Sequence, residues 1–116
     1  MPNLMPKDIR VEVETVLRSV QVDPRGRGRS NLTAYQILEK LPQPTRDRLI
    51  AERGGPGLGS GSYYAAANVV SDAAEMLKPN IEIRFLDKSS LKVMLENGIE
   101  IEPGNPNVGL YRLVDQ

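Results

Sequence analysis

Residues 62–78 constrain the fold more than any other segment of the chain. Apolar side chains recur there at intervals of four and three residues, at Tyr63, Ala67, Val70, Ala74 and Leu77. A second apolar stripe runs beside the first, and the five alanines of the segment let other elements approach closely. This spacing predicts a helix with a broad apolar face. We expect it to be the central helix of the domain, closed by Pro79.

Three more helices are predicted ahead of it. Residues 8–20 carry apolar side chains at helical spacing, with Asp8 as the expected N-cap. Residues 33–41 begin with a capping-box pattern, Thr33 followed by Gln36. Two prolines should end that helix, and Thr45 then caps a short helix over 45–53.

After Pro79 the apolar period changes to two, which is typical of strands. The segments are IEIRF at 81–85, LKVMLENGIEIE at 91–102 and LYRLV at 110–114. The second contains Asn97-Gly98, a dipeptide favoured in hairpin turns. The stretch 89–98 also fits a short helix, and both interpretations stay open. In either case helices precede an antiparallel hairpin or meander over about 81–114, so the fold class is α+β.

The absence of cysteine and histidine limits the chemistry available to the chain. It excludes a thiolate nucleophile, an imidazole base, a disulfide framework and a zinc finger. Carboxylates at Glu96, Glu100 and Glu102 flank the predicted hairpin, where alternating charges usually face solvent. We therefore expect a protein that is not an enzyme and that uses no metal or cofactor.

With 116 residues the chain has the length of one small domain. The segment RGRGRSN at 25–31 cannot contribute to a core, and we read it as an exposed linker. It divides residues 1–30, a helix with a basic linker, from a compact α+β unit over 31–116. Neither a signal peptide nor an apolar run of roughly 20 residues is apparent, so we expect a cytoplasmic protein without membrane contact.

The stretch RGGPGLGSGSYY at 53–64 resembles a phosphate-binding loop at first sight. Gly54 and Gly59 have the spacing of a Walker loop, but Ser60 occupies the position of its lysine. The dinucleotide fingerprint fails at the same residue. A helix N-terminus after the loop could still attract an anion, although a plain connection between helices is the simpler interpretation.

Helices followed by a hairpin resemble the layout of a winged helix-turn-helix, although no diagnostic motif identifies a family. The first half of the chain, residues 1–53, holds ten basic and seven acidic side chains. Arginines suit phosphate contacts, and serine, tyrosine and asparagine suit phosphates or bases. The sequence therefore predicts a small, winged-helix-like nucleic-acid-binding protein with a regulatory role. Its candidate contact residues are Arg25, Arg27, Arg29, Arg46, Arg48, Ser62, Tyr64 and Asn68.

The alternative is a module for protein interaction or oligomerisation. It would use helix 8–20 and the alanine-rich helix 62–78, if the first helix does not fold back on its own domain. Salt separates the two hypotheses, because phosphate contacts weaken as salt rises whereas apolar association does not.

Overall fold

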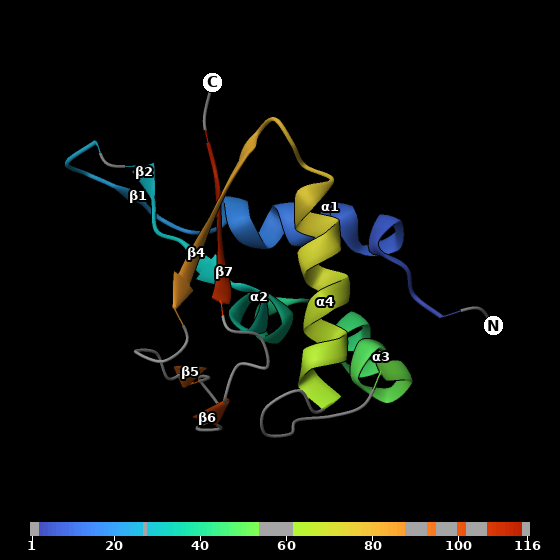
Figure 1. Cartoon of the computed structure of the whole chain (residues 1–116). Helices are drawn as coiled ribbons and strands as arrows, with labels where there is room; N and C mark the ends of the chain where they lie inside the picture. Colours follow the sequence, from blue (N-terminus) through green and yellow to red (C-terminus); the bar gives the residue numbers. More distant parts are fainter. Residues whose placement is uncertain are drawn as a thin grey trace.

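The computed structural model describes residues 3–26, 28–53, 62–87, 93–94, 100–101 and 107–114. Within these ranges the fold is α+β, as predicted, with antiparallel strands (Figure 1). The helices are α1 (Pro6–Arg18), α2 (Ala34–Lys40), α3 (Gln43–Arg53) and α4 (Ser62–Glu75). The strands are β1 (Val22–Asp23), β2 (Gly28–Arg29), β3 (Leu32–Thr33), β4 (Ile81–Asp87), β5 (Val93–Met94), β6 (Glu100–Ile101) and β7 (Asn107–Leu113).

Helix α4 is the centre of the helical layer, as its sequence predicts. It contacts α1, α2 and α3, and Figure 1 shows α1 crossing its upper half and α3 beside its lower half. The small side chains of α4 make these contacts possible, and they are fully or almost fully buried: Ala66, Ala67, Val69, Val70, Ala73 and Ala74. The glycine-rich loop that precedes α4 lies outside the described residues.

Helix α1 belongs to the same core. Its buried side chains, Ile9, Val13, Val16 and Leu17, join one cluster with residues of α2, α3, α4 and β7. The helix therefore packs on its own domain.

The starts of α2 and α1 can be compared with the capping residues that the sequence predicts for them. Thr33 and Gln36 form the predicted capping box, in which Gln36 N–H donates to Thr33 Oγ1 (3.2 Å) and Thr33 N–H donates to Gln36 Oε1 (2.8 Å). The expected cap at Asp8 is wrong by three residues, because Met5 is the N-cap and Pro6 the first residue of α1. Proline suits that position, since it lacks an N–H that would be unpaired there anyway. Asp8 instead accepts a hydrogen bond from Met5 N–H (2.8 Å).

The start of α3 also differs from the prediction. The helix begins at Gln43, so Pro44 lies in its first turn, where a proline breaks no hydrogen bond. Thr45 is then a residue of the helix rather than its cap. Its hydroxyl donates to the carboxylate of Glu12 on α1, at 2.9 and 2.8 Å, and so joins two helices.

The main sheet has the strand order β3-β7-β4, with all pairs antiparallel. Strands β4 and β7 pair over seven residues each, from Ile81 opposite Leu113 to Asp87 opposite Asn107. The period-two prediction for these segments is confirmed. In the region left open between strand and helix, β5 pairs with β6, so residues 93–94 are strand; the turn at Asn97-Gly98 lies outside the described residues.

A close contact ties this sheet to α4. The hydroxyl groups of Tyr111 on β7 and Ser71 on α4 are hydrogen-bonded. The ring of Tyr111 lies over Gly109, where a Cβ atom would come within 2.5 Å of the tyrosine oxygen. Glycine at this position is therefore a steric requirement.

The segment read as a linker is partly structured. Strands β1 and β2 form a small hairpin in which Val22 lies opposite Arg29 and Asp23 opposite Gly28. Gly26 and Gly28 have φ values of +84° and +82°, a conformation that glycine adopts without strain. Alternating glycines thus let this basic segment reverse direction. Arg27 lies outside the described residues.

Among the described residues, no helix has the length and apolar character needed to cross a membrane. The same part of the chain contains no cluster of three or more acidic side chains able to hold a metal ion.

Two valines of α1 test whether this helix is part of the core. Val13 is completely buried and Val11 is 68% exposed, two residues away on the same helix. We expect Val13→Ala to lower the free energy of unfolding by about 2 kcal/mol through lost burial and a residual cavity. Val11→Ala should change it by less than about 0.5 kcal/mol. Urea denaturation measures both, and equal effects would contradict the docking of α1.

Candidate nucleic-acid interface

The β1–β2 hairpin presents the first group of predicted site residues. Arg25 is exposed in its turn, and the Arg25 backbone N–H donates to Asp23 Oδ1 (2.8 Å), which holds the turn. Arg29 is half-buried, and its carbonyl accepts a long hydrogen bond from Arg112 Nη1 on β7 (3.5 Å). In Figure 1 the hairpin projects away from the helical layer, at the end of the molecule where the C-terminus lies.

Arg112 is a basic residue that sequence reasoning missed. Its Nε and Nη2 groups donate to the two carboxylate oxygens of Glu82 on β4, at 3.1 and 3.3 Å. The hydrogen bond from Arg112 is the main influence that lowers the pKa of Glu82, and Arg84 adds to it. The pairing of β4 with β7 creates this contact by placing Glu82 opposite Arg112, so no local sequence pattern could have revealed it.

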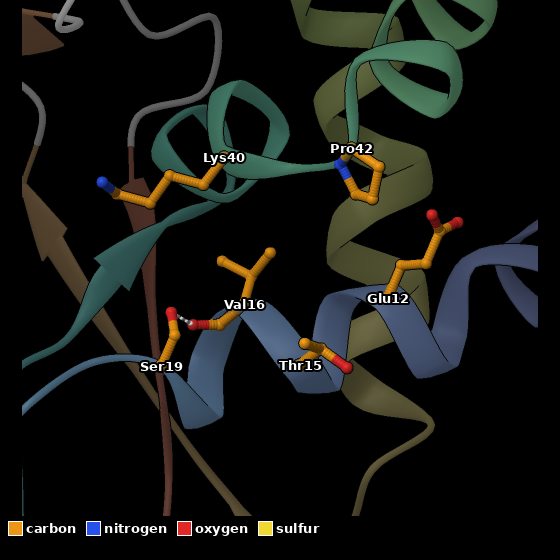
Figure 2. Close-up of a pocket in the computed structure, with 6 residues that line it drawn as sticks. All are labelled: Glu12, Thr15, Val16, Ser19, Lys40 and Pro42. Carbon is orange, nitrogen blue, oxygen red and sulfur yellow. Dashed lines mark hydrogen bonds between the residues drawn. The ribbon is translucent and has the colours of Figure 1, made fainter.

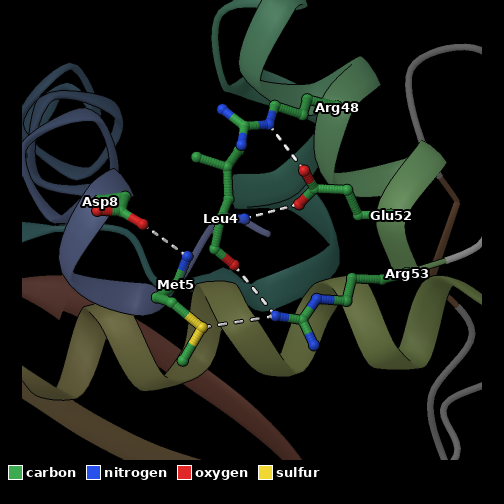
Figure 3. A network of polar contacts seen from close by, with 6 residues as sticks. All are labelled: Leu4, Met5, Asp8, Arg48, Glu52 and Arg53. Atoms are coloured by element: carbon green, nitrogen blue, oxygen red, sulfur yellow. Dashed lines mark hydrogen bonds and ion pairs between the residues drawn. The ribbon is translucent and has the colours of Figure 1, made fainter. Parts of the chain in front are cut away.

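The α3 arginines make contacts within the chain (Figure 3). Arg48 Nε donates to Glu52 Oε2 (2.7 Å), and Glu52 Oε1 accepts the backbone N–H of Leu4 (2.7 Å). Arg53 Nη2 donates to the Leu4 carbonyl (3.1 Å). Arg48, Glu52 and Arg53 of α3 therefore hold the segment before α1 in place. Arg48, which the sequence predicts as a nucleic-acid contact, is thus already paired with Glu52.

Arg46 lies near the start of α3, two residues before Arg48 of that network. Its Nη1 donates to the carbonyl of Glu39 on α2 (3.2 Å), and its Nε lies 3.7 Å from Asp47 Oδ1. Arg46 therefore links α3 to the end of α2. A phosphate would have to compete with these two acceptors for the guanidinium group of Arg46.

Helix α4 carries the remaining candidates. Asn68 is exposed, as are Asp72 and Glu75 one and two turns later. Ser62 and Tyr64 lie in the first turn of α4, where the structure describes the backbone but not their side chains. The exposed strip of α4 is thus neutral at Asn68 and acidic toward its C-terminal end.

The acidic end of α4 lies near the buried Tyr111. Burial is the main cause that raises the pKa of this tyrosine; its hydrogen bond with Ser71 opposes the shift, and the charges of Glu75 and Asp72 add to it. The negative charge at this end of α4 therefore discourages a second anion there.

The structure does not bring all the predicted residues together. In Figure 1 the N-terminal end of α4 and the β5–β6 hairpin lie toward one end of the molecule, and the β1–β2 hairpin lies toward the other. Arg46 and Arg48 occupy a third location, on α3. The candidates therefore form separate groups instead of one patch.

A shallow groove of about 360 Å³ lies between α1 and the α2–α3 connection (Figure 2). Its lining residues are Glu12, Thr15, Val16, Ser19, Lys40 and Pro42. Lys40 and Glu12 point away from one another at its two ends in Figure 2. The hydroxyl of Ser19 donates to the Val16 carbonyl (2.6 Å), and Glu12 accepts from Thr45. The Ser19 hydroxyl and the Glu12 carboxylate therefore make contacts within and between the helices.

No protein-family model, curated protein or solved structure matches this chain. A functional assignment therefore rests on the geometry of the molecule itself.

The contacts of Glu52 generate a pH-dependent prediction. The Leu4 N–H hydrogen bond, followed by Arg48, lowers the pKa of Glu52 below its ordinary value of 4.5. A pKa that is lower in the folded state stabilises the fold at pH values above the pKa of the unfolded state. This contribution disappears as the pH falls through the pKa of the folded state. We expect Glu52→Gln to reduce the loss of stability that acidification causes between about pH 6 and pH 3.

Denaturation midpoints at several pH values measure this effect. Glu14→Gln on α1 is the control for the removal of one carboxylate. Equal acid sensitivity of the wild type and Glu52→Gln would show that Glu52 does not fasten the N-terminal segment.

Proposed function

We propose that this protein binds double-stranded nucleic acid, in the manner of a winged helix-turn-helix, and that it has no enzymatic activity. The observation that carries the proposal is the order of the elements around α4. Along the described part of the chain, three helices precede it, and β4 and β7 follow it as a long antiparallel pair. The short β5–β6 hairpin lies between those two strands in the sequence. We place the protein in the cytoplasm, consistent with a regulatory role on nucleic acid.

The N-terminal half of α4 is the part of this arrangement best suited to a base contact. Helix-turn-helix proteins read base edges with the first residues of their recognition helix. Ser62, Tyr64 and Asn68 occupy that half of α4, and an asparagine amide can make two hydrogen bonds to adenine. Asp72 and Glu75 lie toward the other end of the helix, away from the residues proposed to contact the bases.

The short hairpin supports the same orientation. Figure 1 shows β5–β6 toward the same end of the molecule as the start of α4. A duplex that receives the start of α4 in its major groove would pass close to this hairpin, which would contact the backbone.

Arg25 would have a different task at the other end of the molecule. The molecule measures 39 × 35 × 23 Å, and one turn of duplex spans about 34–36 Å. A duplex that reached both of these ends would present phosphates to each of them. Arg25, with Arg29 beside it, would contribute a phosphate contact at its end of the molecule, which positions the duplex without reading its sequence.

The alternative of a protein-interaction module based on α1 and α4 gains no support from the fold. The apolar faces of these helices are buried against one another within the chain. Val11 on α1 and Met76, just after the end of α4, are exposed as single large apolar side chains, and scattered residues of this kind are ordinary on a surface.

Fluorescence anisotropy with a panel of labelled duplexes, across a series of salt concentrations, tests the proposal. We expect salt-sensitive binding. Arg25→Ala should reduce the slope of log affinity against log salt by about 1 and leave the ranking of the duplexes unchanged. Asn68→Ala should reduce discrimination among the duplexes by about 1–3 kcal/mol.

Arg10→Ala is the matched control, since Arg10 is an exposed arginine on α1, a helix that the proposed contact does not use. It should lower affinity less than Arg25→Ala does. No binding at low salt, or equal losses in the Arg10 and Arg25 variants, would contradict the proposal.

A further inference from the structure

Strand β4 has one free edge in the part of the chain that the structure describes. Its seven residues pair with β7 on one side, and no described strand lies on the other. A strand edge presents backbone N–H and C=O groups that can pair with another strand. Native proteins usually protect such an edge by keeping it short or by covering it.

The side chains of β4 are unusually apolar for an open edge. Phe85 is 68% exposed and Leu86 is 41% exposed, next to each other in the chain. Phe85 shares a face with Ile81 and Ile83, which pack against the core, and it lies opposite Gly109 on β7. The apolar face of the strand therefore continues beyond the helices that cover its first half.

The charges on the opposite face are self-complementary. Glu82 and Arg84 lie one residue before and one residue after Ile83. Suppose that two copies of β4 pair antiparallel about a two-fold axis at Ile83. Each Glu82 then lies opposite the Arg84 of the other copy, and each Ile81 lies opposite the Phe85 of the other copy. Opposite charges and apolar pairs placed in this way stabilise a sheet.

The neighbouring registers lack this match. An axis at Arg84 would place that arginine against its own copy and Ile81 against Asp87. An axis between Ile83 and Arg84 would place residues of opposite faces against one another, which disrupts the apolar side. The sequence of β4 thus selects one register.

We propose that this protein forms a homodimer by antiparallel pairing of β4 with β4 of a second copy, with the two-fold axis at Ile83. The contact is isologous, because the same edge is used by both copies. It joins the two main sheets into one continuous sheet with the order β3-β7-β4-β4-β7-β3. The dimer uses residues other than those proposed for nucleic acid, so either proposal can fail without the other.

Sedimentation equilibrium of the full chain, from micromolar concentrations upward, tests the dimer. The mass should rise from 12.8 kDa toward twice that value as the concentration increases. Arg84→Glu places glutamates opposite one another at both symmetric pairs and should weaken association by about tenfold. The matched control Arg10→Glu makes the same change of charge at an exposed position on α1 and should leave association unchanged.

A mixture of two variants tests the register itself. Arg84→Glu alone and Glu82→Arg alone each bring like charges together in a homodimer. When they are mixed, both pairs join opposite charges, so association should return as a heterodimer. Circular dichroism of each variant confirms folding, which matters for Glu82→Arg because Arg112 loses its partner.

Three results would overturn the proposal. The first is a wild-type mass that stays at that of one chain at every concentration. The second is equal weakening by Arg84→Glu and Arg10→Glu. The third is a mixture of the two folded variants that does not associate although the wild type does.

Discussion

Close packing against the small-residue face of α4 is the contact on which the rest of the structure depends. Alanines and valines on this helix allow α1 and the pair α2–α3 to approach from different sides. Larger side chains would hold these helices apart, since protein interiors are packed near the density of organic crystals. The sheet depends on the same helix, because β4 continues the chain from it and Tyr111 of β7 bonds to its Ser71.

Polar contacts between distant residues complete this arrangement. Glu12 accepts the hydroxyl of Thr45, Glu52 accepts the N–H of Leu4, and Glu82 accepts Arg112. In each case a carboxylate of one element receives donors from another and fixes how the two lie. Several basic groups therefore serve the fold, which leaves Arg25 as the exposed arginine best placed for a ligand at its end of the molecule.

Much of the fold follows from local patterns in the sequence. The apolar stripe of α4, the capping box at Thr33 and the period-two segments after Pro79 each report the conformation of neighbouring residues, and each is confirmed. The site is less predictable, because it depends on contacts between residues far apart in the chain. Neither the role of Arg48 in fastening Leu4 nor the position of Arg112 beside Glu82 has a local signal. The start of α3 differs from the prediction because a proline such as Pro44 is typical of a helix end, although it also suits the first turn of a helix.

The most direct test of the proposed function is a nuclear magnetic resonance titration of ¹⁵N-labelled protein with duplex DNA at low salt. Binding through the start of α4 predicts that the backbone amides of residues 62–68 shift most, with Arg25 and its neighbours shifting at the other end of the molecule. Amides of the exposed face of α1 should stay unchanged. An absence of shifts, or shifts concentrated on α1 or on the acidic end of α4, would contradict the assignment of α4 as the helix that contacts nucleic acid.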